Sequence, residues 1–133
     1  MVSNEDGYVN AGLLVLRIGI GCMFLYHGLP KLLGGPAVWT ELGKAMGALG
    51  VTFAPVFWGF MAAFSEAFGA VALITGLLIR PFCALLAIEM AVAANMHLRK
   101  GDGLLVASHA IEAGIVFLSL IFTGAGKYRI GKF

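Results

Sequence analysis

Four long apolar runs constrain the fold of this chain more than any other feature of its sequence. They cover residues 11–29, 55–79, 82–98 and 104–123. A helix needs about 20 residues, within a range of about 17–25, to cross the hydrocarbon core of a bilayer. Strands of a membrane barrel would instead appear as alternating segments of about ten residues. The runs therefore predict four transmembrane helices.

The composition supports lipid as the solvent of these runs. Of the 133 residues, 60% are hydrophobic and 12% are charged, whereas soluble domains have roughly 45–50% apolar and about 25% charged residues. The mean hydropathy is +0.94. We therefore predict an all-α integral membrane protein, with a single transmembrane domain over residues 1–133 that forms a four-transmembrane-helix bundle.

The segment between the first two runs has a helical pattern of its own. Pro36 suits the first position of a helix, and apolar residues then recur at helical spacing up to Leu49. This pattern predicts a short interfacial amphipathic helix over residues 37–49, with a lid over the mouth of the bundle as the alternative. We also expect Pro30 to end the first helix, because proline removes a backbone donor, and Arg80-Pro81 to end the second.

Eight polar side chains lie within or at the ends of the runs, and they are the candidate pocket residues: Arg17, His27, Lys31, Glu66, Glu89, His97, His109 and Glu112. At 1.5 Å of rise per residue, the three glutamates fall near mid-membrane. The three histidines fall in the half opposite to the side where the chain enters its first span. We call the entry side side A and the opposite side side B.

A charge at the bilayer centre costs roughly 2.5–3.5 kcal/mol on insertion scales, so we expect these groups to face the interior. Two interpretations remain open: a polar pocket that binds a ligand, and a purely structural network in which Arg17 pairs with glutamates. In either case we expect Arg17 to lie within ion-pair reach of Glu66 or Glu112. We also expect His27 and Lys31 to line the mouth at side B, near the other histidines.

Several classes of function are excluded or disfavoured. The formal net charge of +2 is small and scattered, which argues against nucleic acid as a partner. Cys22 and Cys83 are isolated and form no CxxC motif, so an autonomous thiol-redox enzyme is not expected. The pair His109 and Glu112 reverses the Glu-x-x-His order of di-iron bundles and occurs once, so we predict no metal site. No nucleophile–base pair is visible, and we assign no catalytic residue.

Four stretches carry a family resemblance: LRIGIG, FLYHGLPKL, EAFGAVALITGLLIR and GAGKYRIG. In order and spacing they resemble the DoxX family of small four-helix membrane proteins, over about residues 13–131. The matching positions are Arg17, Gly28, Lys31, Leu32, Glu66, Gly69, Gly76, Arg80, Gly124, Gly126, Lys127 and Tyr128. The chain departs from the family pattern at Ala125, Arg129 and Gly131, which puts any role of the family's terminal aspartate in doubt.

The resemblance implies a subunit or partner of a membrane redox system. Our first hypothesis is a redox-associated protein that binds a quinone or similar small amphiphile in the bundle. Phe24, Tyr26 and Phe64 would suit such a ligand, with His27 or Lys31 to hydrogen-bond a carbonyl. The second is a non-catalytic scaffold or assembly factor with a structural polar core. The expected partners are the lipid bilayer, a protein of a redox complex and a second copy of the chain.

The distribution of Lys and Arg predicts the orientation. Four cations fall on each side: Arg80, Lys127, Arg129 and Lys132 on side A, and Lys31, Lys44, Arg99 and Lys100 on side B. Lys31 is expected to belong to the bundle mouth, and the tail gathers three cations that can meet anionic lipid, at roughly 1 kcal/mol each. We therefore expect a multi-pass protein of the bacterial cytoplasmic (inner) membrane, with both termini in the cytoplasm.

Overall fold

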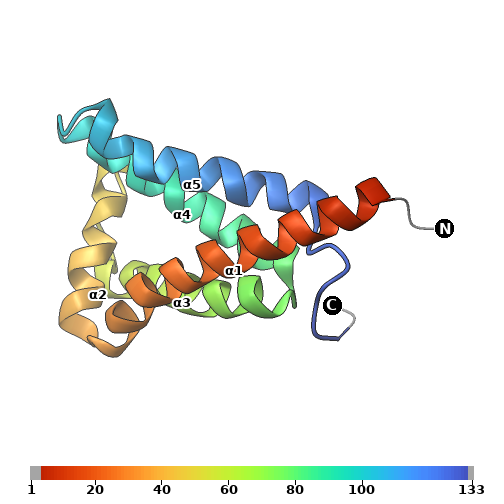
Figure 1. The fold of residues 1–133 in the computed structure, drawn as a ribbon. Coiled ribbons are helices and arrows are strands. Elements are labelled where there is room, and N and C mark those ends of the chain that lie inside the picture. The colour runs from red at the N-terminus through yellow and green to blue at the C-terminus, as the bar shows by residue number, and fades with distance from the viewer. Residues whose placement is uncertain (1–3, 132–133) are drawn as a thin grey trace.

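A computed structural model describes residues 4–131 and shows helices with no strand within that range (Figure 1). In chain order the elements are α1 (Asn4–Leu33), α2 (Pro36–Gly43), the 3-10 helix η1 (Lys44–Leu49), α3 (Pro55–Thr75), α4 (Ile79–Arg99) and α5 (Leu104–Thr123). Four of these, α1, α3, α4 and α5, are long and apolar enough to cross a membrane. The predicted all-α, four-helix membrane fold is confirmed.

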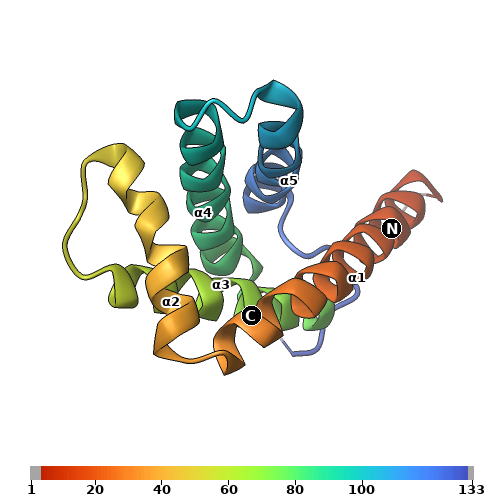
Figure 2. The same ribbon diagram turned by 90° about the vertical axis from the view of Figure 1, so that its left-hand side faces the viewer.

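The four long helices pack as an open arc. The backbone of α1 lies against α3, α3 against α4, and α4 against α5, while the backbone of α5 approaches no other helix within the described residues. In Figure 2, α1 and α5 diverge from each other on one side of the molecule. Side chains bridge them at one level, where the rings of Phe24 and Phe117 meet edge to face at 4.9 Å between centroids.

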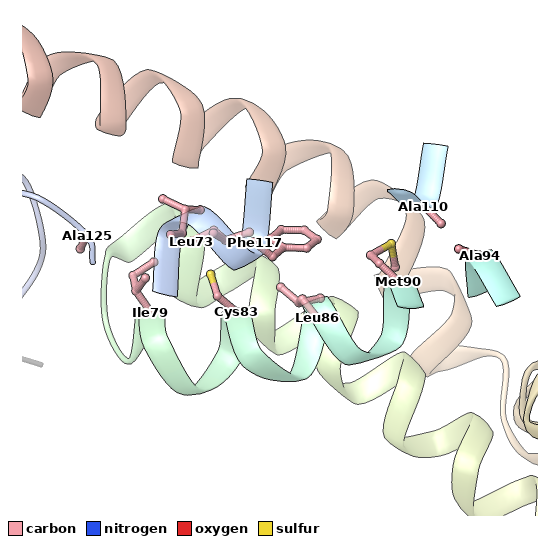
Figure 3. Packing of buried hydrophobic residues seen from close by; sticks show 10 residues of the cluster. Leu73, Ile79, Cys83, Leu86, Met90, Ala94, Ala110, Phe117 and Ala125 are labelled. Atoms are coloured by element: carbon pink, nitrogen blue, oxygen red, sulfur yellow. The ribbon is translucent and has the colours of Figure 1, made fainter. Parts of the chain in front are cut away.

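The core lies where α3, α4 and α5 meet, and Phe117 sits within it (Figure 3). Its centre is fully buried and consists of Leu73, Cys83, Leu86, Phe117 and Leu120. Because lipid tails are as apolar as these side chains, close packing rather than hydrophobicity holds such helices together. Gly69 shows how close the packing is, since a Cβ there would lie 2.8 Å from Cδ1 of Leu86.

The segment between α1 and α3 is helical, as the sequence predicts for residues 37–49. It starts with Pro36 at its first turn and continues from α2 into η1 without a gap. The two pack across the side-B ends of α3 and α4. Gly35, with φ of +80°, makes the turn that leads out of α1.

Two expected helix ends are wrong. Pro30 lies inside α1, which continues to Leu33; the φ of proline fits a helix, and the turn after it is held by Lys31, whose carbonyl accepts from Trp39 Nε1 at 3.1 Å. The second span ends earlier than Arg80-Pro81, because Gly76 caps α3 with φ of +82°. Pro81 instead lies in the first turn of α4, where a missing N–H leaves no bond broken.

Candidate functional site

A cavity of about 490 Å³ lies between the α2–η1 segment, α3 and α4, at the side-B end of α1. Four of the eight candidate residues line it: Lys31, Glu66, Glu89 and His97. Small-molecule sites are usually clefts of roughly 300–1,000 Å³ that combine apolar walls with a few polar groups. The cavity has the size and the mixed lining of such a site.

An ion pair between α1 and α3 forms one wall of the cavity. Lys31 Nζ contacts both carboxyl oxygens of Glu66, at 2.9 and 3.1 Å, and the Glu66 side chain is 6% exposed. The two helices cross closely at Gly28, where a Cβ would lie 2.7 Å from the Cβ of Glu66. This close crossing brings Lys31 within reach of the Glu66 carboxyl. Lys31 follows Gly28 by one turn of α1 and so lies over the carboxyl.

Glu89 of α4 adds a second carboxyl beside this pair. It lies within interaction range of both Glu66 and Lys31. Its Oε2 is buried and has no hydrogen-bond partner among the described residues. An unpaired buried polar group costs about 1–3 kcal/mol. A ligand that supplies a hydrogen bond to this oxygen would remove that cost, and this makes Glu89 the polar group of the cavity most open to a ligand.

The side-B end of the cavity carries a hydrogen-bonded histidine. His97 Nδ1 lies 2.8 Å from Asp102 Oδ2, and Lys100 Nζ lies 3.7 Å from the same oxygen. The hydrogen bond with His97 is the main reason why the pKa of the Asp102 carboxyl lies below its usual value, and the charge of Lys100 lowers that pKa further. This hydrogen bond fixes the orientation of the His97 imidazole ring.

The remaining walls are mostly apolar and adaptable. Four methionines line the cavity, Met46, Met61, Met90 and Met96, together with aromatic rings that include Trp58. Unbranched thioether side chains adjust to irregular shapes and contact aromatic rings favourably. A polar end and a flexible apolar wall together fit an amphiphilic small molecule.

Arg17 is buried as expected, at 1% exposure, but the predicted ion pair with a glutamate is wrong. Its guanidinium donates to backbone carbonyls: Leu73 at 2.9 Å, Ala125 at 2.8 Å, Tyr128 at 2.5 Å and Ile74 at 3.4 Å. These carbonyls belong to the last turn of α3 and to the tail after α5. Both segments leave carbonyls without helical partners, and a guanidinium carries five donors. Arg17 therefore ties the tail to the bundle at side A.

Further hydrogen bonds hold the same tail in place. The Ile130 amide donates to the Thr75 carbonyl at 2.8 Å, and the Lys127 amide donates to Asn10 Oδ1 at 2.8 Å. Gly124 and Gly126 have φ of +70° and +81°, so the GAGKYRIG stretch turns back across the ends of α1 and α3. Lys132 lies outside the described residues.

Besides Arg17, three candidate residues lie outside the cavity. His27 is exposed on α1, and its ring meets Tyr26 edge to face at 5.4 Å between centroids. His109 and Glu112 are exposed on α5. The predicted mouth thus contains Lys31 and His97 but neither His27 nor His109.

The sequence reasoning missed Glu41 and the uncharged part of the lining. Ser65 and Trp58 line the cavity, and both lie on α3 near Glu66. Trp58 lies about two turns before Glu66 on the same helix, so the helical repeat carried a signal for it. Ser65 is adjacent to Glu66 and gave no such signal, because neighbouring residues point in different directions. No group of three or more His, Cys, Asp or Glu in residues 4–131 could hold a metal ion.

Comparison with known protein families gives a match. The family model described as DoxX matches residues 12–99 of the chain. Those residues contain most of α1 and all of α2, η1, α3 and α4. They include the five charged or ionisable residues that line the cavity, Lys31, Glu41, Glu66, Glu89 and His97. Neither a curated protein nor a solved structure matches the chain significantly.

Proposed function

The chain belongs to the DoxX family and is a small multi-pass membrane protein, and we propose that it binds a quinone or similar small amphiphile. The ligand would lie in the cavity between α2–η1, α3 and α4. The chain would bind it as a subunit or partner of a membrane redox system. The observation that carries the proposal is the buried Glu89 Oε2, which has no partner in residues 4–131 and borders a cavity of about 490 Å³.

The polar end of the cavity suits the head of such a molecule. Lys31 can donate a hydrogen bond to a carbonyl oxygen, and Glu89 can accept one from a hydroxyl. The two groups lie within interaction range of each other, so one ring with oxygens on opposite sides can reach both. A quinone carbonyl can accept from Lys31, and in the reduced form a ring hydroxyl can also donate to Glu89.

The apolar end suits the rest of the molecule. Met46, Met61 and Met96 approach from three different elements, and their side chains can adapt to a tail of variable shape. The α2–η1 segment covers one side of the cavity. It could therefore act as a lid while it lies at the membrane interface. A change in its position would control entry of the ligand.

A non-catalytic scaffold or assembly factor is the alternative, and two observations favour it. Arg17 joins α1 to α3 and to the tail, and Lys31 with Glu66 joins α1 to α3 again. Both contacts serve the packing of the bundle whether or not a ligand binds. The scaffold hypothesis leaves the unpaired oxygen of Glu89 without a role, and for that reason we rank it second.

Mass spectrometry of the gently purified protein separates the two functions. We expect a lipophilic small molecule to co-purify with the unmodified chain and to be lost from Ala62→Phe, which fills the cavity. Ala11→Phe adds the same ring on an exposed face of α1 and should retain the molecule. Equal recovery from all three proteins, or none from any, would support the scaffold instead.

We further propose that both termini face the cytoplasm of a bacterial cell and that the cavity opens toward the outer side of the inner membrane. The positive tail supports this orientation, and Lys31 does not count as a loop cation because it pairs with Glu66. Reporter fusions at the C-terminus test it. A reporter active only in the cytoplasm is expected, and activity outside would reverse the orientation.

A further inference from the structure

The outward face of α5 carries polar side chains that the cavity does not use. Ala107, Ala110 and Phe117 are turned inward and buried, whereas His109 and Glu112 are exposed. Glu112 is the ninth residue of a helix of 20 residues, so it lies close to mid-membrane. Neither side chain has a hydrogen bond or an ion pair with any residue in 4–131, the part of the chain that the structure describes.

None of the residues that the structure describes covers this face. The backbone of α5 packs against α4 and against no other helix among the described residues, and Figure 2 shows α5 at the edge of the arc. In the hydrocarbon region, polar groups are normally turned toward the protein and paired. A carboxyl that points outward at this depth therefore indicates contact with another protein surface.

We propose that the face of α5 formed by His109, Glu112 and Ser119 is the interface with a second copy of this chain. His109 and Glu112 are three residues apart and share a face, with a separation of about 4.5 Å along the helix axis. One has a ring N–H to donate and the other has carboxyl oxygens to accept. The face is therefore complementary to itself.

A twofold axis along the bilayer normal satisfies both groups at once. Two copies in the same membrane orientation place their α5 helices parallel, with the same residues at the same depth. Each His109 can then donate to Glu112 of the partner subunit, and the same bond forms a second time by symmetry. A different protein would have to supply an acceptor and a donor at these two depths, so the self-complementary pattern selects a second copy.

Ser119 extends this face toward side A. It follows Glu112 by seven residues, two turns of the helix, and its hydroxyl is turned back to the Ile115 carbonyl at 2.8 Å. A small residue in this position lets two helices approach closely. The interface then runs from His109 to Ser119 along one stripe of α5, which is separate from the cavity.

Disulfide cross-linking in native membranes tests which face is in contact. In a Cys22→Ser background, which removes an exposed thiol, Ser119→Cys should form a covalent dimer on mild oxidation. Leu118→Cys is the matched control, because Leu118 is also exposed but points about 100° away. Equal cross-linking at both positions would overturn the proposal, and so would a cross-linked product at 119 that has the mass of a different protein.

Dimerisation measured by energy transfer in lipid vesicles tests the pairing itself. Glu112→Leu and His109→Leu should each weaken the dimer at least tenfold, while His27→Leu, at an exposed histidine of α1, should leave it unchanged. The exchange variant with both His109→Glu and Glu112→His should recover affinity within about threefold, because the bonds reform in reverse. A monomer at every protein density, or no effect of Glu112→Leu, would refute a self-paired α5.

Discussion

Replacing Arg17 with leucine removes a side chain that joins α1, α3 and the tail at side A. The guanidinium donates to three carbonyls at 2.9 Å or less, from Leu73, Ala125 and Tyr128. The leucine variant leaves all three carbonyls without that donor in a site where Arg17 is 1% exposed. We expect the last turn of α3 to loosen and the tail to detach from the bundle.

The size of the effect follows from these bonds. A hydrogen bond to a charged group contributes about 1.5–3 kcal/mol, and a buried acceptor left unpaired costs about 1–3 kcal/mol. Three such acceptors, partly rehydrated when the tail detaches, give an expected loss of about 3–5 kcal/mol in the free energy of unfolding. Arg17→Lys keeps the charge but lacks the planar fork of donors, so it should lose about half as much.

The assay is unfolding by SDS in mixed micelles, followed by tryptophan fluorescence and by protease cleavage of the tail. Arg80→Leu is the matched control, because Arg80 is exposed and donates one hydrogen bond, to the Ile121 carbonyl at 2.9 Å. We expect that control to lose under about 1 kcal/mol. If Arg17→Leu and Arg80→Leu unfold alike, Arg17 does not hold the tail and the reasoning is wrong.

Three further predictions concern packing, pH and the ion pair. Gly28→Ala should destabilise the fold by about 1–3 kcal/mol in the same unfolding assay, because its Cβ would lie 2.9 Å from the Ala67 amide. Gly19→Ala, whose Cβ would have nothing within 4 Å, should be neutral or stabilising. A larger loss of stability in Gly19→Ala than in Gly28→Ala would contradict the close crossing of α1 and α3. Since the pKa of Asp102 is lowered in the folded protein, its contact with His97 stabilises the fold above the usual carboxyl pKa and is lost as the pH falls through the lowered value. A carbon-detected NMR titration should therefore show a higher pKa for Asp102 in His97→Gln, and an unchanged value would refute the contact. Lys31→Met should cost about 3–5 kcal/mol, because it leaves the Glu66 carboxyl buried without its cation; Lys44→Met, which loses an exposed ion pair, should cost under about 1 kcal/mol, and equal losses would argue against a structural role for Lys31.

The helices were predictable from sequence because the bilayer fixes their length. The runs located α1, α3, α4 and α5, and apolar spacing located the helical segment after Gly35. The helix ends were less predictable, since proline weakens a helix only where it removes a bond. Pro30 removes one from a turn that other contacts support, and Pro81 removes none.

The depth of the candidate side chains in the membrane could be predicted from sequence, but the face of the helix on which each one lies could not. Placing charges along the helices put Glu89 and Glu112 at similar depths, yet the structure turns one into the cavity and the other outward. Which face of a helix is buried depends on its neighbours, and α5 has its only backbone contact among the described helices with α4. The hydrogen-bond partners of Arg17 could not be predicted from sequence either. They are backbone carbonyls, which every residue has, and they reach Arg17 only because the tail folds back against the bundle.

The most direct test of the central claim, that the cavity holds an amphiphile, is a fluorescence titration with a short-chain benzoquinone. In Trp39→Phe the remaining tryptophan, Trp58, lines the cavity, so bound quinone should quench it along a saturable curve in lipid nanodiscs. Glu89→Leu should weaken binding of the corresponding hydroquinone, measured by its displacement of the benzoquinone, about tenfold, equivalent to about 1.4 kcal/mol, because it removes the acceptor for a ring hydroxyl. The Trp58→Phe variant, which keeps only Trp39, is the comparison. If quenching of Trp58 rises linearly with quinone concentration and equals the quenching of Trp39, the cavity holds no quinone site.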